Sequence, residues 1–226
     1  MRRFRYMQLD VFTNEPFGGN QLAVFFDTTS LTSEDMQRIA REMNFSESVF
    51  TLPAREAKSL TRLRIFTPQV ELPFAGHPII GAAFALAAAG RVTPGSESPI
   101  TLDLGIGPLD VDLLFSDTRL SFAWMRQRNS TFTQWTGDRA ALAASVGLAE
   151  SDLRADLPIE TGSAGVPHTL IPVVDAAKLD AAKPGANLGE ALNTSEPCGA
   201  YFFVPPTKSA PNHVYSRMFG PHMGIA

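Results

Sequence analysis

The sequence predicts an α+β fold in which a curved sheet wraps around a central helix. Several segments alternate apolar and polar residues, which is typical of half-buried strands. Between them, residues 78–90 (PIIGAAFALAAAG) are apolar around the whole circumference of a helix, and such a helix must be enclosed by other elements. The chain has 226 residues, of which 44% are hydrophobic and 19% charged, so it can form an ordinary globular core.

Four strands of the first half, around 7–11, 62–65, 100–104 and 109–113, follow from this alternation, and three more are apolar segments bounded by turn residues. Leu9 and Val11, for example, alternate with Gln8 and Asp10. Clusters of Gly, Pro, Asn and Asp separate the segments and supply turn geometry. The predicted strands lie around Met7–Val11, Gln21–Phe26, Ser48–Leu52, Arg62–Ile65, Ile100–Leu104, Leu109–Leu113 and Leu120–Met125.

Two helices interrupt these strands. Met36, Ile39, Ala40 and Met43 have the spacing of a surface helix that buries one face, with Thr32 as its N-cap and an end near Asn44. The second helix is the apolar segment 78–90. It starts at Pro78, which is favourable in a first turn, and stops at Gly90.

The second half begins after the polar segment 126–135. Helices are expected around 138–146 and 175–182, and strands around 166–174, 199–204 and 213–219. Arg217-Met-Phe-Gly-Pro221 repeats the pattern of Arg64-Ile-Phe-Thr-Pro68. In the first half this pattern precedes the apolar helix, whereas the corresponding helix of the second half would start beyond Ala226. We therefore expect a complete domain over residues 1–125 and an incomplete one over 126–226 that lacks its central helix.

Composition excludes several classes of protein. A net charge of −4 is unsuited to a generic nucleic-acid binder. The single cysteine, Cys198, cannot form an internal disulfide or a pair of catalytic thiols, and it fits a reducing compartment. Polar residues interrupt the N-terminus, and the apolar helix is too short for a bilayer, so we expect a cytoplasmic protein without a membrane partner.

The first candidate site is Phe74-Ala-Gly-His-Pro78, which places Gly76 and His77 immediately before the apolar helix. Free N–H groups and the helix dipole at such a position suit a carboxylate. The imidazole can donate or transfer a proton near neutral pH. The alternative is that these residues only turn the chain into the helix.

The second candidate is Glu47 in Asn44-Phe-Ser-Glu-Ser-Val-Phe50. A carboxyl group held against Phe45, Val49 and Phe50 would have a raised pKa and could act as both acid and base. The alternative is a solvated loop glutamate.

No other pattern in the sequence predicts a site. His168, His213 and His222 lack the spacing of metal ligands, so no metal is predicted. The glycine-containing segments 17–20 and 161–165 lack the pattern of a phosphate-binding loop, and we interpret both as ordinary loops.

Five blocks, in order, resemble the PhzF-like phenazine-biosynthesis isomerase family. They extend over nearly the whole chain and are Leu9–Val24 (LDVFTNEPFGGNQLAV), Asn44–Phe50, Arg64–Pro68, Leu72–Pro78 (LPFAGHP) and Arg217–Pro221. The resemblance implies a diaminopimelate-epimerase-like fold: two similar domains, each a curved, mostly antiparallel sheet around a central helix, with the active site between them.

The resemblance also implies roles for four residues. The glutamate that matches Glu47 shuttles a proton between carbons of a dihydro-hydroxyanthranilate ring without a cofactor, and the residues that match Gly76 and His77 hold the substrate. Asn20 is expected at the substrate site as well, although the chain has Gly19-Asn20-Gln21 where family members usually have Gly-Asn-Pro. Related epimerases that use two cysteines are excluded because Cys198 is the only cysteine.

Two functions follow as hypotheses. The first is a PhzF-like isomerase or epimerase that acts on a small carboxylate-bearing substrate, with a homodimer expected. The second is a truncated, catalytically incompetent fragment that only binds ligand or self-associates. The second hypothesis arises because family members continue beyond the block that matches Arg217–Pro221. They have an Asp-Pro-Ala-Thr-Gly-Ser motif, a second central helix and closing strands. In the family this motif supplies an aspartate and a serine to the substrate site.

Overall fold

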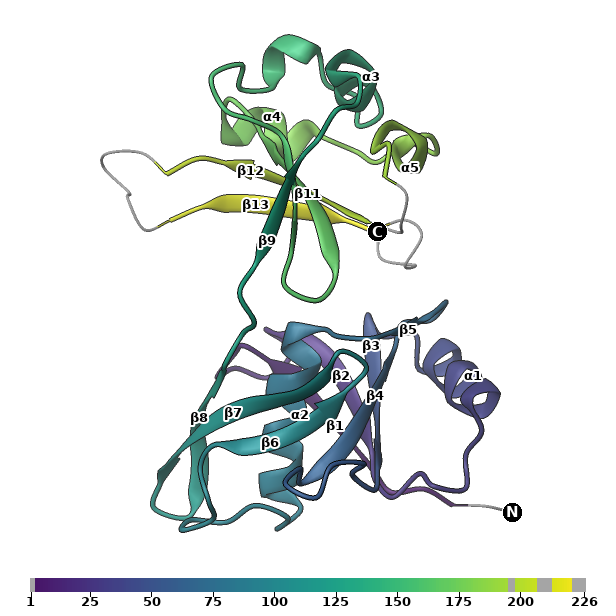
Figure 1. Cartoon of the computed structure of the whole chain (residues 1–226), viewed down its shortest axis with the longest axis vertical. Coiled ribbons are helices and arrows are strands. Elements are labelled where there is room, and N and C mark those ends of the chain that lie inside the picture. The colour runs from purple at the N-terminus through teal and green to yellow at the C-terminus, as the bar shows by residue number, and fades with distance from the viewer. Residues whose placement is uncertain (1–2, 195–197, 207–212, 221–226) are drawn as a thin grey trace. The chain divides into compact units, whose positions relative to one another are not determined.

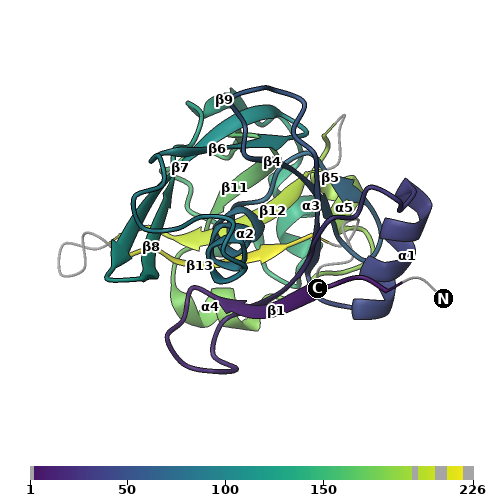
Figure 2. The ribbon, with the colours of Figure 1, turned by 90° about the horizontal axis from the view of Figure 1, so that it is seen from below.

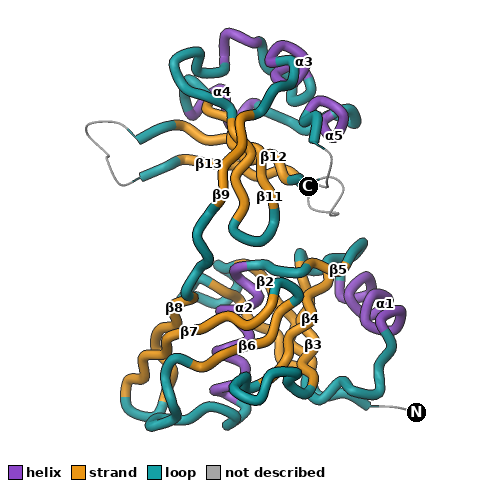
Figure 3. Tube along the Cα trace, viewed as in Figure 1, coloured by secondary structure: helices purple, strands orange, loops and turns teal. Residues whose placement is uncertain are grey.

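The chain forms two compact units, Met1–Arg128 and Asn129–Ala226, in the computed structural model (Figure 1). The structure describes residues 3–194, 198–206 and 213–220. The predicted features at Pro221 and His222 lie outside these residues. Each unit combines a sheet with helices, as the predicted α+β class requires (Figure 3).

The sheet of the first unit has eight strands, mostly antiparallel. Their order is β1-β2-β3-β4-β6-β7-β8, with β5 paired to β4, and only the pairs β2/β3 and β4/β6 are parallel. All seven strands predicted in this half are confirmed, whereas the two-residue strand β5 is too short to show alternation. The strands are β1 (Tyr6–Val11), β2 (Asn20–Phe25), β3 (Glu47–Leu52), β4 (Thr61–Phe66), β5 (Glu71–Leu72), β6 (Ile100–Leu104), β7 (Gly107–Ser116) and β8 (Arg119–Met125).

Helix α1 (Ser33–Met43) covers one face of this sheet and confirms the prediction. Thr32 is its N-cap and forms a capping box with Asp35, and Asn44 ends the helix in the left-handed region at φ 54°. Met36 and Ala40 pack against strand residues that include Phe50.

Helix α2 (Gly76–Ala88) lies on the opposite face of the sheet, which curves around it (Figure 2). The helix packs closely on the first two strands, since a Cβ atom on Gly81 would lie 2.5 Å from Leu22 Cδ2. The expected start at Pro78 is wrong, because the helix begins at Gly76, after the extended residue Ala75. First-turn N–H groups need no acceptor within the helix, so Gly76 and Pro78 are both tolerated there.

The expectation that α2 is enclosed on every side is also wrong. Ile80 and Phe84 are only half-buried. They line a groove of about 540 Å³ between β1 and β8, the two end strands of the sheet. The helix is therefore covered on most of its circumference, and one apolar strip faces the groove. None of the helices in the described part of the chain is long and apolar enough to cross a membrane.

The second unit has a five-stranded sheet of order β13-β12-β11-β10-β9. Its strands are β9 (Thr131–Gln134), β10 (Glu160–Ser163), β11 (Pro167–Pro172), β12 (Gly199–Val204) and β13 (Tyr215–Phe219), and its helices are α3 (Arg139–Ala144), the short 3₁₀ helix η1 (Glu150–Asp152), α4 (Ala176–Ala181) and α5 (Leu188–Ala191). The predicted strands at β11, β12 and β13 and the helices at α3 and α4 are confirmed. The interpretation of 161–165 as a loop is wrong, because residues 161–163 pair with both neighbouring strands. Strand β9, within the polar segment 126–135, and the short helices η1 and α5 were not predicted.

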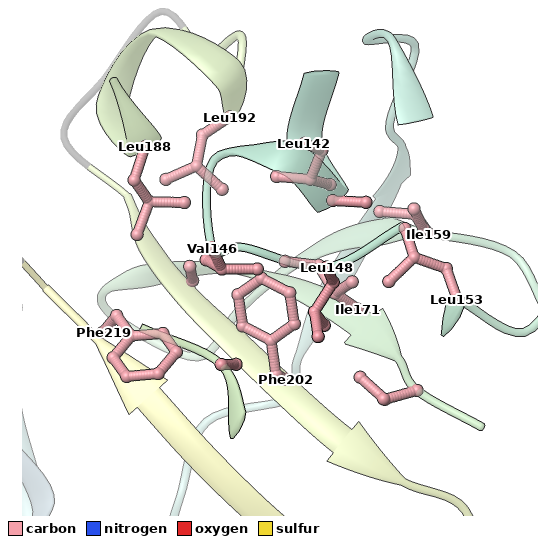
Figure 4. Packing of buried hydrophobic residues seen from close by; sticks show 14 of the residues in the cluster. Leu142, Val146, Leu148, Leu153, Ile159, Ile171, Leu188, Leu192, Phe202 and Phe219 are labelled. Carbon is pink, nitrogen blue, oxygen red and sulfur yellow. The ribbon is translucent and has the colours of Figure 1, made fainter. Parts of the chain in front are cut away.

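The helices of the second unit pack on one face of its sheet around a separate core (Figure 4). Phe202 and Ile171 contribute from the strands, and Leu142, Leu179 and Leu188 contribute from α3, α4 and α5. All five side chains are fully buried. Among the described residues of this unit, no helix packs on the opposite face of the sheet.

The two units share one strand arrangement. In the first unit, β1/β2 is antiparallel, β2/β3 parallel and β3/β4 antiparallel. In the second, β10/β11 is antiparallel, β11/β12 parallel and β12/β13 antiparallel. The repeated pattern around Arg64 and Arg217 lies on β4 and β13, which have the same place in this arrangement. The sequence repeat therefore corresponds to a structural repeat.

Candidate active site

Three elements of the first unit bring Glu47, His77 and Asn20 together. Glu47 is the first residue of β3 and lies opposite Leu22 of the parallel strand β2. Asn20 is the first residue of β2, and His77 lies in the first turn of α2. The predicted residues thus come from three separate segments whose ends meet on the α2 side of the sheet.

The Glu47 carboxyl group and the His77 imidazole lie next to each other in a buried position. Glu47 is 6% exposed and His77 is 9% exposed. Glu47 Oε2 and His77 Nε2 are 3.4 Å apart, and neither atom has a hydrogen-bond partner among the described residues. Buried polar atoms are rarely left without partners, so this pair is a place where a ligand can supply them.

Burial shifts the two pKa values in opposite directions. It raises the pKa of Glu47, and the Ser46 hydroxyl opposes this effect. Burial lowers the pKa of His77 to about 4. A hydrogen bond between the His77 ring and the Gln21 backbone has the smaller, opposite effect and raises this pKa. His77 is therefore neutral at neutral pH, so the 3.4 Å contact is not an ion pair between two charged groups there.

Asn20 and Ser46 extend this pair into a chain of polar groups. The Ser46 hydroxyl donates to Asn20 Oδ1 at 3.0 Å, and Asn20 Nδ2 lies 3.3 Å from His77 Nδ1. The sequence analysis did not identify Ser46. The only signal was its place beside Glu47 in the block 44–50, and nothing in that block indicates contact with Asn20.

The N-terminus of α2 adds free N–H groups to the site. No side chain caps this end of the helix. A Cβ atom on Gly76 would meet no atom closer than Met125 Cε at 3.8 Å, which is an ordinary contact. Packing within this unit therefore does not require glycine at residue 76, and an open N-terminus of this kind suits an anion.

The second unit does not repeat the carboxyl group. Ser48 pairs with Phe66 on β4, and Ala200 pairs with Phe219 on β13, so Gly199 has the place of Glu47. A Cβ atom on Gly199 would lie 2.6 Å from the ring of His168, which covers it. Cys198 is buried, and burial raises the pKa of its thiol. No group of three potential metal ligands occurs among the residues that the structure describes.

The fold and this site define the class of the protein. It has the diaminopimelate-epimerase-like α+β fold, with a buried carboxyl and imidazole pair at a helix N-terminus. The chain belongs to the PhzC-PhzF family of phenazine biosynthesis-like proteins, which it matches over residues 9–226. By family it is an enzyme of the isomerase class.

Individual relatives support this assignment. The chain is 36% identical to trans-2,3-dihydro-3-hydroxyanthranilate isomerase of Pseudomonas aeruginosa over 98% of this chain and 73% of that protein. The crystal structure of a PhzF-family phenazine biosynthesis protein from Bacillus anthracis is 29% identical, with a TM-score of 0.81 over 99% of this chain and 74% of that one. A probable proline racemase from Agrobacterium radiobacter, 12% identical, shares the fold with a TM-score of 0.66 over 96% of this chain and 70% of that one.

Proposed function

We propose that the chain is a PhzF-like isomerase in which Glu47 moves a proton between two carbons of one small carboxylate-bearing molecule without a cofactor. The observation that carries this proposal is the buried pair of unpartnered atoms, Glu47 Oε2 and His77 Nε2, 3.4 Å apart. A carboxyl group with a raised pKa can accept a proton and return it at moderate pH.

The proposed reaction is balanced within the substrate. The Glu47 carboxylate takes a proton from one carbon as the electron pair of that C–H bond moves into the conjugated system. The protonated Glu47 then gives the proton to a second carbon, which forms the new C–H bond. No atom or electron is gained or lost, so the product is an isomer. The neutral His77 imidazole lies close enough to hydrogen-bond the same molecule as it is deprotonated.

The proposed substrate resembles dihydro-hydroxyanthranilate. Relatives from three Pseudomonas species are named trans-2,3-dihydro-3-hydroxyanthranilate isomerase. The uncapped N-terminus of α2 at Gly76 would receive the substrate carboxylate, which places the ring beside Glu47.

Turnover in deuterated water tests this function. The purified chain is incubated with trans-2,3-dihydro-3-hydroxyanthranilate, and NMR follows the isomer and the deuterium it acquires. Glu47→Gln should lower the rate about 10²–10⁴-fold, because the amide cannot accept the proton. Glu42→Gln, at an exposed position on α1, is the matched control and should retain the wild-type rate. Circular dichroism checks that both variants fold.

Two results would contradict the proposal. Wild-type activity in Glu47→Gln would remove this residue from the mechanism. Saturable binding of the substrate without turnover or deuterium exchange would favour the binding-only alternative. The expected homodimer and the cytoplasmic location stay separate predictions, and analytical ultracentrifugation tests the first.

A further inference from the structure

Ser46 lies in a short turn where the starts of two neighbouring strands meet. It comes two residues after Asn44, which ends α1 in the left-handed region, and directly before Glu47, the first residue of β3. Strands β2 and β3 are parallel neighbours, so this turn lies beside Asn20, the first residue of β2. The strand pairing therefore places Ser46 between two residues of the candidate site.

The Ser46 hydroxyl contacts a side chain in each of these two strands. Its Oγ lies 3.0 Å from Asn20 Oδ1. It also hydrogen-bonds the Glu47 carboxyl group. Glu47 Oε2 has no hydrogen-bond partner among the described residues, so this second bond involves the other oxygen, Oε1. One oxygen of Glu47 is thus held by Ser46, whereas Oε2 faces His77 Nε2 at 3.4 Å.

The Ser46 hydroxyl has one proton and two acceptors within reach. An ionised carboxylate is a stronger acceptor than an amide oxygen, because hydrogen bonds to charged groups are about twice as strong as neutral ones. Once Glu47 has taken a proton on Oε2, its Oε1 is a neutral acceptor like Asn20 Oδ1, and the hydroxyl can donate to either. Ser46 therefore stabilises the ionised form of Glu47 more than the protonated form.

We propose that Ser46 is a positioning residue that anchors Oε1 of Glu47 and leaves Oε2 as the oxygen that takes and returns the proton. This role rests on the proposed function, in which Glu47 moves the proton. The terminal torsion of a glutamate is broad, so a carboxyl group without an anchor can turn and exchange its two oxygens. The hydroxyl selects the orientation in which Oε2 lies beside His77 Nε2, where a substrate would meet both unpartnered atoms.

The surroundings of Glu47 allow a change in its protonation to be assigned to Ser46. The titratable group that faces Glu47 is His77 of α2. On β2 the opposite residue is Leu22, which does not titrate. Burial and the Ser46 hydroxyl are the causes of the Glu47 pKa shift, and no charged side chain among the described residues adds to them. His77 is therefore the one neighbour whose protonation has to be followed as well.

Carbon-13 NMR of protein labelled at the glutamate carboxyl carbon tests this role without substrate. Glu47→Gln identifies the signal of residue 47 by its loss, and the wild-type titration midpoint is expected above 4.5. In Ser46→Ala the midpoint should rise by about one further pH unit, because the ionised form loses a charge-assisted hydrogen bond. Ser46→Thr keeps a hydroxyl group and should retain the wild-type midpoint. A midpoint in Ser46→Thr as high as that of Ser46→Ala would count against an effect of the hydroxyl.

Ser48→Ala is the matched control. Ser48 lies on the same strand, and its buried hydroxyl has no hydrogen-bond partner among the described residues. The control removes the same group from β3 without removing a contact to Glu47, and it should leave the midpoint unchanged. Circular dichroism checks that the variants fold. An unchanged midpoint in Ser46→Ala, or an equal rise in Ser48→Ala, would overturn the proposed role of Ser46.

The pH profile of turnover supplies the second measurement. A base must be ionised to act, so kcat/KM should rise with pH through the pKa of Glu47. In Ser46→Ala this rise should occur about one pH unit higher, with kcat/KM about tenfold lower below it. Histidine NMR signals recorded over the same range separate the titration of His77, whose pKa is about 4.

The rate at high pH tests the anchoring itself. There Glu47 is ionised in both proteins, and kcat of Ser46→Ala should still be lower, by up to about 10²-fold, because the carboxyl group is no longer held in one orientation. Recovery of the wild-type kcat at high pH would contradict the anchoring of Oε1. If the NMR midpoint moves as expected but the wild-type protein converts no substrate, Ser46 still controls Glu47 and the isomerase proposal fails. If substrate is converted and the midpoint does not move, the reverse holds.

Discussion

At the scale of single residues, the same burial acts oppositely on Glu47 and His77. A low-polarity environment disfavours the charged form of each group, so the acid binds its proton more tightly and the base more weakly. The pKa of Glu47 is raised, and that of His77 falls from 6.5 to about 4. Both groups therefore link folding to pH, with opposite signs.

The sign for His77 follows from proton binding. Between pH 6.5 and about 4 the unfolded chain binds a proton at His77 that the folded chain does not bind. The free energy of unfolding therefore falls as pH falls through this window, by up to about 3 kcal/mol for the full shift. Glu47 contributes the reverse, because the folded chain binds its proton more tightly, so stability falls as pH rises above 4.5.

We predict that His77→Gln removes the first of these contributions. The difference in unfolding free energy between wild type and variant should change in favour of the variant as pH falls from 6.5 toward 4. Urea unfolding followed by circular dichroism at several pH values measures it. His213→Gln, at an exposed position, is the control. A difference between wild type and His77→Gln that is constant over this pH range would contradict the assignment of a buried neutral imidazole.

At the scale of elements, Arg64 and Arg217, the arginines of the repeated pattern, make equivalent contacts in the two units. The Arg64 guanidinium lies over the Phe66 ring at 5.0 Å, and that of Arg217 lies over Phe219 at 4.9 Å. Arg64 donates to Ser33, the first residue of α1. Arg217 donates to carbonyl groups at the end of α4. Each arginine thus ties a strand to the helix that covers its sheet.

Arg217→Met should destabilise the second unit. The Arg217 Nη1 group lies 2.8 Å from Leu179 O, 3.1 Å from Asp180 O and 2.8 Å from Ala182 O. Loss of this donor removes a charged hydrogen-bond partner from the carbonyl groups at the end of α4, and we expect the free energy of unfolding to fall by about 1–3 kcal/mol.

Tryptophan fluorescence during urea unfolding measures the stability of the second unit. The chain has two tryptophans, and Trp124→Phe leaves only Trp135, which is buried in the core of the second unit. Arg154→Met is the matched control, because Arg154 pairs with exposed Asp156 and such surface pairs contribute little. Equal unfolding midpoints for the two variants would show that Arg217 does not hold α4.

At the scale of the whole molecule, the chain consists of two units with separate cores. The core of the second unit contains only residues after 128. The cluster in which Met36 and Ala40 of α1 pack against Phe50 contains only residues before 128. Residues 126–130, which connect β8 to β9, are exposed and have no regular secondary structure. A short exposed connection between two cores is a preferred place for proteolysis.

Limited digestion with trypsin should therefore cut first after Arg126 or Arg128. The cut after Arg128 gives fragments 1–128 and 129–226, which mass spectrometry identifies. Two further exposed loops of the first unit carry basic residues. Loop 53–60 is held by Asp103, which accepts from Arg55 N at 2.6 Å and Ser59 Oγ at 2.9 Å. Arg91, in loop 90–99, pairs with Asp27 at 2.6 Å. The double variant Arg126→Gln, Arg128→Gln should lose the first cut. Initial cleavage within 53–60 or after Arg91 would contradict this prediction.

The sequence alone was sufficient where local forces decide the structure. Helix α1 was predicted with both ends, because Thr32 and Asn44 satisfy its terminal backbone groups through neighbouring residues. The strands β1, β4, β6 and β7 follow from alternation, whereas β2 and β3 are continuous apolar runs that were predicted from the turn residues on either side of them. Glu47 and His77 were identified as candidates because each lies at the start of an apolar element, and the structure places them 3.4 Å apart.

Only the tertiary structure decided what depends on contacts between distant segments. Strand β10 has no apolar alternation and exists because β9 and β11 pair with both its edges. The groove along α2 depends on where the two ends of the sheet lie. Asn20 and His77 are 57 residues apart, and Ser46 joins them because the starts of β2 and β3 are neighbours. Sequence spacing determines which groups the chain carries, whereas strand pairing and helix packing determine which of them meet.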